Sequence, residues 1–407
     1  MGNAPNPPLD GVRVLEVGTF IAGPFAGQQL GDLGADVVKI ESPKGGDPLR
    51  HWRDLGPGDL WWPSIARNKR LVALDLSEKS GADVFRRLCQ EADILIENFR
   101  PGALERWGVG PEILWEVNPR LVVVRISGFG QDGPLSNNPG FGSIGEAMGG
   151  IRHLTGWPDR PSTRVGISLG DEITALFGVI GALSALRVAE KTGVGQVVDV
   201  AIYEAVFALM ESTVAEYELL GHIRNRSGAT LPNIAPSNTY PTADGTELLI
   251  AANSDVMFHR LMVALDLEEI ATEARFRNHV ERGRHAAEVD EIISKRTILL
   301  PAHEVMQKCR SAGVPVGKVY TAADMSADPH FAARNAISRV AVEGVGLVPM
   351  PAPTPRFSRT PTEIRWPGSK VIGAHTREVL HEWVGLTDEQ IDAFCQSQVI
   401  HEEQATS

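Results

Sequence analysis

The first 200 residues of the chain alternate short apolar runs with segments of helical periodicity. The runs that predict strands are 12–17, 36–40, 71–74, 94–96 and 121–126. Helical periodicity at 25–33 and 81–91 fills two of the gaps between them. Short apolar strands separated by helices are typical of a parallel sheet that helices cover on both faces. The pattern therefore predicts an α/β fold whose ligand binds beyond the carboxyl ends of the strands, near the turns after Val17 and Ile96.

The pattern changes between residues 221 and 319. A polar loop that contains proline, 231–240, leads into the apolar run 247–252 and then into helices rich in charge. This mixture predicts a smaller α+β domain.

The C-terminal part returns to longer connections and two amphipathic helices. Six prolines between 349 and 367 predict an extended segment, because proline interrupts a helix. The helices expected at 378–383 and 388–398 can pack back on the first domain. We therefore expect a large domain begun by 1–220, a small domain over 221–325 and a return segment over 326–407 that completes the large domain.

Composition narrows the class of partner. The chain has 407 residues and a net charge of −12, from 39 basic and 51 acidic side chains. This balance argues against a nucleic-acid partner, and any polyanionic ligand must be met by local positive groups.

The cysteines and the apolar runs bear on the compartment. Cys89, Cys309 and Cys395 are far apart and lack the spacing of metal ligands, which favours reduced thiols and a cytoplasmic location. The first eight residues contain no apolar signal core. The apolar run 173–186 is too short to predict a membrane span, so no membrane partner is expected.

The chemistry-bearing candidate with the strongest local context is Asp171. It follows Gly170 and precedes an apolar helix rich in small residues, so it lies near a helix N-terminus, where negative charge is favoured. An ionised carboxylate held against an acyl carbon can act as a nucleophile. The alternative is an ordinary N-cap aspartate, which is equally compatible with the sequence. Glu172 is expected to be a solvated acid of the first turn.

Two basic segments are candidates for phosphate binding. Residues 68–70, Asn-Lys-Arg, could hold phosphate, but an exposed cationic turn is the commoner meaning of such a segment. Arg100 and Arg106 could clamp a diphosphate, because guanidinium binds phosphate in bidentate fashion. Surface ion pairs of these arginines with Glu97 and Glu105 are the alternative.

Other catalytic patterns are absent from the sequence. The eleven histidines form no metal-binding motif, so we expect no metal. The glycine-rich segment 128–134 lacks Walker spacing and a lysine, and no Gly-x-Ser-x-Gly elbow of a serine hydrolase occurs.

Several blocks in the same order make the chain resemble the class III CoA-transferases, the family of formyl-CoA transferase and carnitine CoA-transferase. The resemblance runs from Pro8 to about Gln398. The blocks are 9–17, 22–24, 33–41, 46–50, 68–70, 97–99, 170–171, 313–317 and 373–376.

The resemblance implies a covalent mechanism and a set of contacts to coenzyme A. Asp171 matches the aspartate that attacks the acyl-CoA, forms a mixed anhydride and then carries CoA as an aspartyl thioester. The positions that match CoA contacts are Ile21, Ala22, Leu74, Asp75, Leu76, Ser77, Asn98, Phe99 and Arg106. We add Arg100 to this set because of its charge and its proximity.

The resemblance also implies an architecture. It predicts a Rossmann-like large domain with a parallel sheet, built from both chain ends, and a smaller α+β domain. Two chains would thread each other as linked rings, in an interlocked homodimer.

Three departures from the family pattern concern the substrate pocket. Phe141 is followed by Gly142, where the family often has an acid. Glu146 replaces a glutamine of the formyl-CoA members, and their glycine-rich loop has no counterpart near 253–254. The last two departures argue against oxalate as the acceptor.

Two other functions compete with CoA transfer. The related α-methylacyl-CoA racemases need two acid/base groups and have a histidine at the position of Phe141. Phenylalanine cannot move a proton, so racemisation is the second choice. A CoA-binding module without catalysis would not need Gly170-Asp171.

For the acceptor, the overall sequence and the loop 235–238 resemble succinyl-CoA:dicarboxylate members, such as the glutarate enzymes. We therefore expect succinyl-CoA as the donor and a small carboxylic, in particular a dicarboxylic, acid as the acceptor. Phe141 is placed in the substrate pocket, and Arg164 or Arg50 could bind the second carboxylate.

Overall fold

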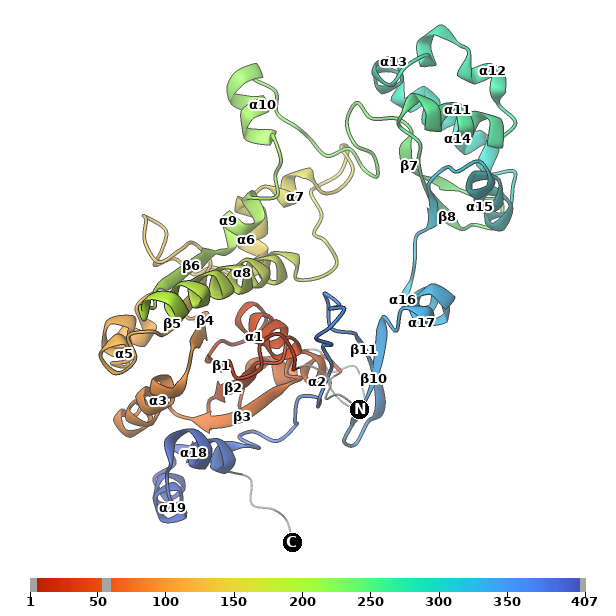
Figure 1. Cartoon of the computed structure of the whole chain (residues 1–407). Coiled ribbons are helices and arrows are strands. Elements are labelled where there is room, and N and C mark those ends of the chain that lie inside the picture. The colour runs from red at the N-terminus through yellow and green to blue at the C-terminus, as the bar shows by residue number, and fades with distance from the viewer. Residues whose placement is uncertain (1–5, 53–59, 403–407) are drawn as a thin grey trace. The chain divides into compact units, whose positions relative to one another are not determined.

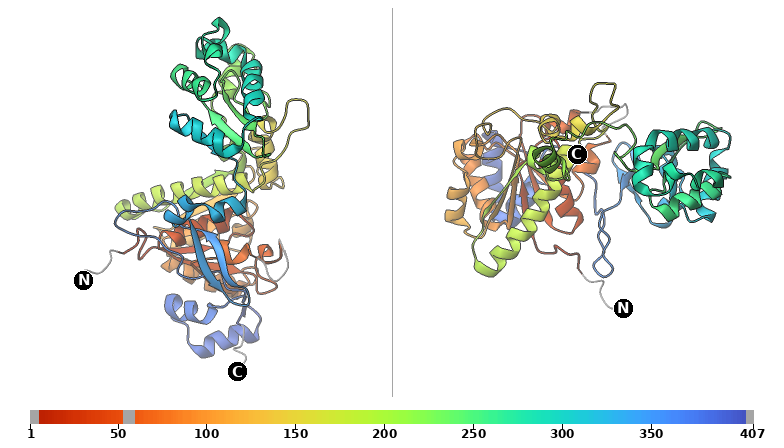
Figure 2. Two further views of the ribbon diagram at one scale, coloured as in Figure 1. Left: turned by 90° about the vertical axis from the view of Figure 1, so that its right-hand side faces the viewer. Right: turned by 90° about the horizontal axis from the view of Figure 1, so that it is seen from above.

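The computed structural model describes residues 6–52 and 60–402, and its contacts group them into two compact units. Figures 1 and 2 show the chain coloured from its N-terminus to its C-terminus. Unit 1 comprises Met1–Ile151, Val165–Ala215 and Ala333–Ser407, so both ends of the chain contribute to it. Unit 2 comprises Arg152–Arg164 and Glu216–Ala332.

A seven-stranded sheet forms the centre of unit 1. Its strands are β1 (Arg13–Glu16), β2 (Asp36–Glu41), β3 (Lys69–Leu74), β4 (Ile94–Glu97), β5 (Val122–Ser127), β6 (Val197–Ala201) and β12 (Ile400–His401). Their order across the sheet is β12-β3-β2-β1-β4-β5-β6. All neighbours are parallel except β12, which pairs antiparallel with β3. The predicted α/β fold with a parallel sheet is confirmed.

The order from β3 to β6 places a switch point between β1 and β4. Successive strands run outward in one direction from β1 to β3 and in the other direction from β4 to β6. Doubly wound sheets with this order bind their ligands in the crevice outside the carboxyl ends of the strands. The topology therefore draws attention to the ends of β1, β2, β3 and β4.

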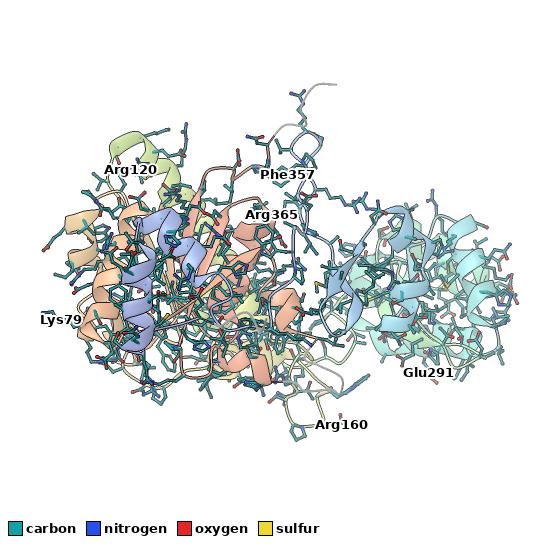
Figure 3. The ribbon with its side chains drawn as sticks, turned by 90° about the horizontal axis from the view of Figure 1, so that it is seen from below. Lys79, Arg120, Arg160, Glu291, Phe357 and Arg365 are labelled. Carbon is teal, nitrogen blue, oxygen red and sulfur yellow. The ribbon has the colours of Figure 1, made fainter. Side chains whose placement is uncertain are left out.

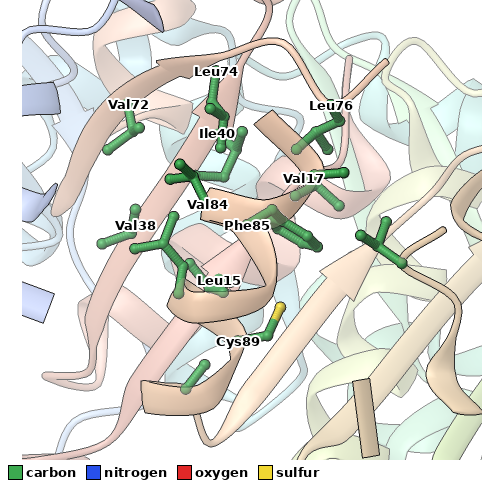
Figure 4. Close-up of a cluster of buried hydrophobic side chains, with 14 of the residues drawn as sticks. Leu15, Val17, Val38, Ile40, Val72, Leu74, Leu76, Val84, Phe85 and Cys89 are labelled. Atoms are coloured by element: carbon green, nitrogen blue, oxygen red, sulfur yellow. The ribbon is translucent and has the colours of Figure 1, made fainter. Parts of the chain in front are cut away.

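One face of the sheet is covered by large side chains from two helices of the N-terminal half and two helices near the C-terminus. Here α3 (Lys79–Glu91), α5 (Pro111–Val117), α18 (Thr376–Val384) and α19 (Asp388–Gln396) contribute to one buried cluster. Phe85, Leu88 and Trp383 belong to the same buried cluster as Leu15, and Figure 4 shows part of it. The amphipathic C-terminal helices predicted from the sequence thus do pack back on the large sheet.

The other face is covered by helices with small residues. It carries α1 (Ala22–Asp32) and α8 (Leu169–Thr192), and Figures 1 and 2 show these two helices together on one side of the sheet. Ala175, Ala182 and Ala189 of α8 are buried against this face. A small side chain lets a helix approach a sheet closely.

Helix α8 is longer than its apolar run indicated, because the polar residues after Leu186 continue it to Thr192. The prediction from the apolar run 173–186, that this segment is too short to span a bilayer, is therefore wrong for the helix as a whole. Within the described part of the chain, α8 alone passes a test of length and hydropathy for a membrane span, and core helices of soluble proteins pass this test as well.

The remaining elements of unit 1 are short. They are η1 (Pro48–His51), α2 (Trp62–Ile65), α4 (Ala103–Arg106), α6 (Gly142–Met148), α9 (Ile202–Phe207) and the hairpin β10 (Ile337–Val342) with β11 (Gly346–Pro351). After β11 the proline-rich segment continues to residue 367 without a helix, as predicted.

Unit 2 is a small α+β assembly with its own core. Its antiparallel sheet has the order β7 (Ser237–Pro241), β8 (Glu247–Ala251) and β9 (Val316–Lys318). Its helical elements are α11 (Asp255–Ala264), α12 (Glu268–Ala271), η2 (Ala274–Phe276), α13 (His279–Arg284), α14 (Ala286–Thr297), α15 (Ala302–Ser311) and α16 (Ala322–Ala327). Helices α7 (Ile151–Leu154), α10 (Thr213–Leu220) and α17 (Pro329–Ala333) lie at the divisions between the units. Strand β7 overlaps the end of the predicted loop 231–240, because pairing with β8 makes this polar segment extended.

Candidate functional site

A cavity of about 310 Å³ lies at the carboxyl ends of the strands of unit 1. Val17, Glu41, Leu74 and Phe99 line it, and they follow or end β1, β2, β3 and β4 respectively. This is the edge at which a doubly wound sheet binds its ligand.

Five of the positions assigned to CoA by resemblance line this cavity. They are Leu74, Asp75, Leu76, Ser77 and Phe99. The two leucines are buried and give the cavity an apolar wall. The ring of Phe99 packs edge-on against Trp107, with the ring centroids 5.1 Å apart.

Asp75 forms a polar corner of the cavity. Its carboxylate accepts hydrogen bonds from the backbone N–H and the hydroxyl of Ser77, and it pairs with the Lys44 ammonium at 3.3 Å. Burial alone would raise the pKa of Asp75, but these partners hold it below its usual value. Lys44 is exposed, lies three residues after the end of β2 and was not among the residues predicted from the sequence.

The turn between β1 and α1 carries Ile21 and Ala22. Ile21 is the residue before the helix and Ala22 is its first residue, and both are buried. The helix thus begins three residues earlier than predicted. The side chain of Asn98 accepts a hydrogen bond from the N–H of Thr19 at 2.7 Å and donates one to its carbonyl at 2.8 Å. Asn98 therefore clamps this turn, and its amide is occupied by the protein backbone.

Arg100 and Arg106 follow β4, and both are exposed. Within residues 6–52 and 60–402 neither makes an ion pair or a hydrogen bond through its side chain. The alternative of surface pairs with Glu97 and Glu105 is wrong, because Arg125 binds both carboxylates, at 2.8 Å and 2.7 Å. The two guanidinium groups therefore remain available to an anion.

The segment 68–70 is neither an exposed turn nor a phosphate site. Asn68, Lys69 and Arg70 are buried, at 1%, 0% and 7% exposure. Lys69 pairs with Glu16 at 2.6 Å, and burial lowers the pKa of Lys69 to about 8. Arg70 pairs with Asp36 across neighbouring strands. Both predictions for this segment, an exposed turn and a phosphate site, are wrong, because its charges are paired with carboxylates inside the protein.

A second buried lysine lies in the floor of the cavity. The ammonium of Lys39 donates to Glu16 at 2.8 Å and to the carbonyl of Gly18 at 2.7 Å, and it pairs with Asp47 at 2.8 Å. The ammonium thus makes two hydrogen bonds and is paired with two buried carboxylates. Burial lowers its pKa, but the neighbouring Asp47 and Glu16 outweigh this effect and hold the pKa above the usual range. A lysine inside a strand as apolar as 36–41 was the signal for this network.

Arg50 is not available as a cation for a substrate. Its guanidinium binds Glu41 through two hydrogen bonds of 2.7 Å and donates to the carbonyl of Lys370 at 2.7 Å. It also stacks on Trp62, 4.0 Å from the ring centroid. The proposed role of Arg50 in acceptor binding is therefore wrong, because the side chain is consumed by a buried internal contact.

Asp171 lies in the first turn of α8. The helix begins at Leu169 after Ser168, so Asp171 is inside the helix and is not its N-cap. Its carboxylate lies on the backbone of Gly142, where an added Cβ would be 2.1 Å from Oδ2. This contact explains why no side chain stands at position 142. The carboxylate thus combines a helix N-terminus with an open neighbouring backbone.

Two other acids flank Asp171. Glu146 of α6 is buried and accepts a hydrogen bond from the N–H of Gly170 at 3.3 Å. This hydrogen bond links α6 to the first turn of α8. Glu172 is half-buried, and burial raises its pKa, so the expectation of a solvated acid is wrong.

An aromatic cluster stands next to this carboxylate. Phe141 precedes Gly142 and is 61% exposed. Its ring packs edge-on against Phe20 at 6.3 Å, and Phe20 packs edge-on against Trp52 at 4.8 Å. Phe20 and Trp52 were missed by the sequence analysis, because the chain separation hides their contact.

Arg164 belongs to unit 2, and Asp171 belongs to unit 1. The role of Arg164 in acceptor binding stays a prediction. Figure 3 shows charged side chains on the surfaces of the units, among them Lys79 and Arg120 in unit 1 and Glu291 in unit 2.

No group of three or more His, Cys, Asp or Glu side chains within 6–52 and 60–402 could hold a metal ion. The three cysteines are free thiols, with Cys89 and Cys309 buried.

The chain is similar to known proteins over most of its length. Residues 9–376 match the model of CoA-transferase family III. A succinyl-CoA–D-citramalate CoA-transferase of Chloroflexus aurantiacus is 50% identical over 389 residues, which cover 95% of this chain and 96% of that protein. A succinate–glutarate CoA-transferase of Agrobacterium fabrum is 34% identical over 94% of this chain and 98% of that protein.

A solved structure is similar to this chain over most of the length of both proteins. The crystal structure of a CAIB/BAIF family protein from Brucella suis has a TM-score of 0.82 and 34% identity, covering 93% of this chain and 100% of that one. The resemblance seen in the sequence is therefore confirmed: the chain belongs to CoA-transferase family III.

Proposed function

We propose that this CoA-transferase uses Asp171 as a covalent carrier and moves CoA from succinyl-CoA to a 2-hydroxydicarboxylic acid of the citramalate type. The observation that carries the chemistry is the Asp171 carboxylate in the first turn of α8, resting on the bare backbone of Gly142. A carboxylate in this position needs no base to act as a nucleophile.

The identities of the relatives support the choice of acceptor. The citramalate enzyme is 50% identical, a succinyl-CoA–L-malate CoA-transferase subunit of the same organism is 40% identical, and the glutarate enzyme is 34% identical. Among the small dicarboxylates that the sequence resemblance suggested, we therefore rank hydroxylated acceptors above glutarate.

Each step exchanges one acyl bond for another. An oxygen of Asp171 attacks the thioester carbonyl of succinyl-CoA, the C–S bond breaks, and CoA leaves as its thiolate. The thiolate attacks the aspartyl carbonyl of the mixed anhydride and releases succinate. The acceptor carboxylate then attacks the aspartyl thioester, and the returning thiolate takes the acceptor acyl group and frees Asp171. The free energy of the thioester is kept throughout, so no ATP is needed.

We assign the nucleotide part of CoA to the cavity at the strand ends. Its apolar wall, Leu74 and Leu76, suits the adenine ring, and Arg100 and Arg106 offer unpaired guanidinium groups to the phosphates. Asn98 supports this site indirectly, because it clamps the turn that carries Ile21 and Ala22.

The acceptor site needs a cation for the second carboxylate. Arg50 is excluded by its contacts with Glu41, so we assign this role to Arg164. Phe141 is assigned to the wall of the acyl site, because its exposed ring precedes the residue on which Asp171 rests.

The architecture that we propose follows the family resemblance. A Rossmann-like large domain is formed by 1–220 and 326–407, and the strand order from β3 to β6 supports it. The small domain covers 221–325, and unit 2 extends it by 152–164, 216–220 and 326–332, which the bounds from the sequence had given to the large domain. A homodimer is supported by exposed apolar side chains such as Ile180, at 61%, and Leu219, at 81%. The free cysteines support a cytoplasmic location.

The experiment that tests the function is an acceptor panel with the purified protein. Succinyl-CoA is offered with D-citramalate, L-malate, glutarate or oxalate, and the CoA thioesters are read by mass spectrometry. We expect the highest kcat/KM with a 2-hydroxydicarboxylate and the lowest with oxalate. Transfer to none of these acids, or racemisation of a 2-methylacyl-CoA instead, would overturn the proposal.

A further inference from the structure

Asp47 joins the buried charges of the cavity floor to the aromatic cluster beside Asp171. Its Oδ2 pairs with Lys39 at 2.8 Å, and both side chains are 1% exposed. Its Oδ1 accepts hydrogen bonds from the N–H of Phe20 at 3.1 Å and of Leu49 at 2.8 Å. One carboxylate thus holds three separate segments of unit 1.

Two of these segments carry aromatic rings of the cluster. Phe20 has a left-handed backbone, with φ of 62°, which a side chain of this size rarely adopts. Leu49 lies in η1, the short helix that Asp47 caps, and Trp52 is the residue that follows this helix. The rings of Phe20 and Trp52 meet edge-on at 4.8 Å. The contact therefore depends on two backbone segments that share Asp47 as their acceptor.

Asp47 is itself fixed from the opposite side. Its N–H donates to Oε2 of Glu41 at 3.0 Å, and the same oxygen of Glu41 accepts from Arg50 at 2.7 Å. The Lys39 ammonium is anchored by Glu16 and by the carbonyl of Gly18. Asp47 has no freedom to follow Phe20 if that residue moves, so it acts as a fixed point for the turn.

The cluster leads directly to the proposed nucleophile. Phe20 contacts Phe141, and the next residue, Gly142, is the backbone on which the Asp171 carboxylate lies. We infer that Asp47 is a positioning residue for acyl transfer, which sets the rings of Phe20, Trp52 and Phe141 around the acyl groups at Asp171. This inference rests on the proposed function, because it assigns the cluster to the acyl site.

The charge of Asp47 and its hydrogen-bonding capacity can be separated by substitution. Asp47→Asn keeps an oxygen for the N–H groups of Phe20 and Leu49 but removes the negative charge beside Lys39. Asp47→Ala removes both. Asp32→Ala is the matched control. Asp32, like Asp47, is a buried carboxylate of unit 1 with a cationic partner, in its case Arg67. It makes no contact with the aromatic cluster among those of the described residues.

The first measurement is the split between kcat and KM. We expect Asp47→Ala to lower kcat by about tenfold or more, while KM for succinyl-CoA changes by less than about threefold. Asp47→Asn should recover most of the lost kcat. Asp32→Ala should lower the melting temperature but keep kcat within about twofold of the wild type. If Asp47→Ala lowered only the melting temperature and kept kcat within about twofold of the wild type, as expected of Asp32→Ala, the inference would be overturned.

The second measurement is the emission of Trp52, isolated as the difference between each protein and its Trp52→Phe counterpart. We expect a red shift in Asp47→Ala and none in Asp32→Ala, because only the first releases the ring of Phe20. Should Asp47→Ala fail to fold, Phe20→Gly removes the ring at a position whose backbone suits glycine, and the same loss of kcat is expected. Unchanged kcat and emission in Phe20→Gly would overturn the inference.

The failure of the proposed function gives a different result. A wild-type protein that transfers CoA to no acid of the panel disproves that function. The Trp52 emission then still decides whether Asp47 positions the cluster.

Discussion

The two faces of the large sheet are packed by different kinds of side chain. On the α3 and α18 face, bulky residues such as Phe85 and Trp383 fill the space above the strands. On the α1 and α8 face, alanines such as Ala175 and Ala182 lie against the sheet. Small side chains bring α8 close to the strands, and its N-terminus carries Asp171. The first face buries bulky side chains, and Leu74 and Leu76 of the same cluster also line the cavity. The second face presents the carboxylate that we propose as the nucleophile.

The largest effect should come from Asp171→Asn on the α8 face. The amide keeps the size of the side chain but is not a nucleophile, so we expect transfer to fall below detection. Protein quenched during turnover with succinyl-CoA should show an adduct at residue 171 in the wild type and none in the variant. Measurable turnover by the variant would show that another group carries the acyl chain.

Gly142→Ala should affect activity more than stability. An added Cβ would lie 2.1 Å from Oδ2 of Asp171, so the carboxylate has to rotate away. We expect kcat/KM to fall by about 100-fold, because misplaced reacting groups lose that much rate. A small change in melting temperature should accompany it.

The matched control for this variant is Gly178→Ala, in the middle of α8. A Cβ there meets Val124 at 3.4 Å, an ordinary contact. Activity should stay near that of the wild type, and the helix should gain up to about 1 kcal/mol from the higher propensity of alanine. Equal loss of activity in both variants would mean that any added methyl group near α8 is harmful.

Phe85→Ala tests the opposite face. Phe85 is fully buried among large side chains, so its truncation leaves a cavity and should cost about 3–5 kcal/mol of unfolding free energy. Denaturant titration measures this loss. At a temperature where the variant is folded, its kcat should equal that of the wild type. A large loss of kcat in the folded variant would contradict the division between the two faces.

The sequence predicted the parallel sheet better than it predicted its charged residues. The strands 36–41 and 94–97 were visible from their apolar residues, and the aspartate of Gly170-Asp171 was visible from the helix that it opens. Lys39 lies within an apolar run that signalled its burial, whereas the sequence of 68–70 around Lys69 is that of an exposed cationic turn. Their burial depends on Glu16 of β1, which is the strand next to that of Lys39 and two strands away from that of Lys69. Pairing between strands is a property of the fold, so no local pattern could reveal it.

The same reason explains the outcomes for the arginines. Arg50 was assigned to the substrate because its partner Glu41 and the carbonyl of Lys370 are brought to it only by folding. Arg100 and Arg106 keep their proposed role because Arg125 takes the carboxylates that might have neutralised them. Whether a cation serves a ligand thus depends on contacts distant in the chain.

Arg100→Ala and Arg106→Ala should weaken CoA binding without changing the chemistry. We expect each to raise KM for succinyl-CoA by about tenfold with kcat unchanged, since an arginine–phosphate contact is a charge-assisted hydrogen bond worth roughly 1.5–3 kcal/mol. Steady-state kinetics measures this change. Arg120→Ala is the control, because Arg120 is an exposed arginine whose nearest carboxylate, Asp93, is 3.9 Å away. An unchanged KM in both variants would place the phosphates elsewhere.

The smallest effect concerns Glu97, which is the last residue of β4. Burial raises the pKa of Glu97 to about 7, even though Arg125 acts against this rise. The folded protein therefore keeps a proton on Glu97 that the unfolded chain releases above about pH 4.5. This contribution to stability is complete below that pH and is lost as the pH rises through 7, at no more than about 1.4 kcal/mol per pH unit. Glu97→Gln should flatten the decline of unfolding free energy between pH 5 and 7, whereas Glu112→Gln, at an exposed position of α5, should leave it unchanged. Equal slopes in the wild type and Glu97→Gln would show that the ion pair with Arg125 outweighs burial and keeps Glu97 ionised across this range.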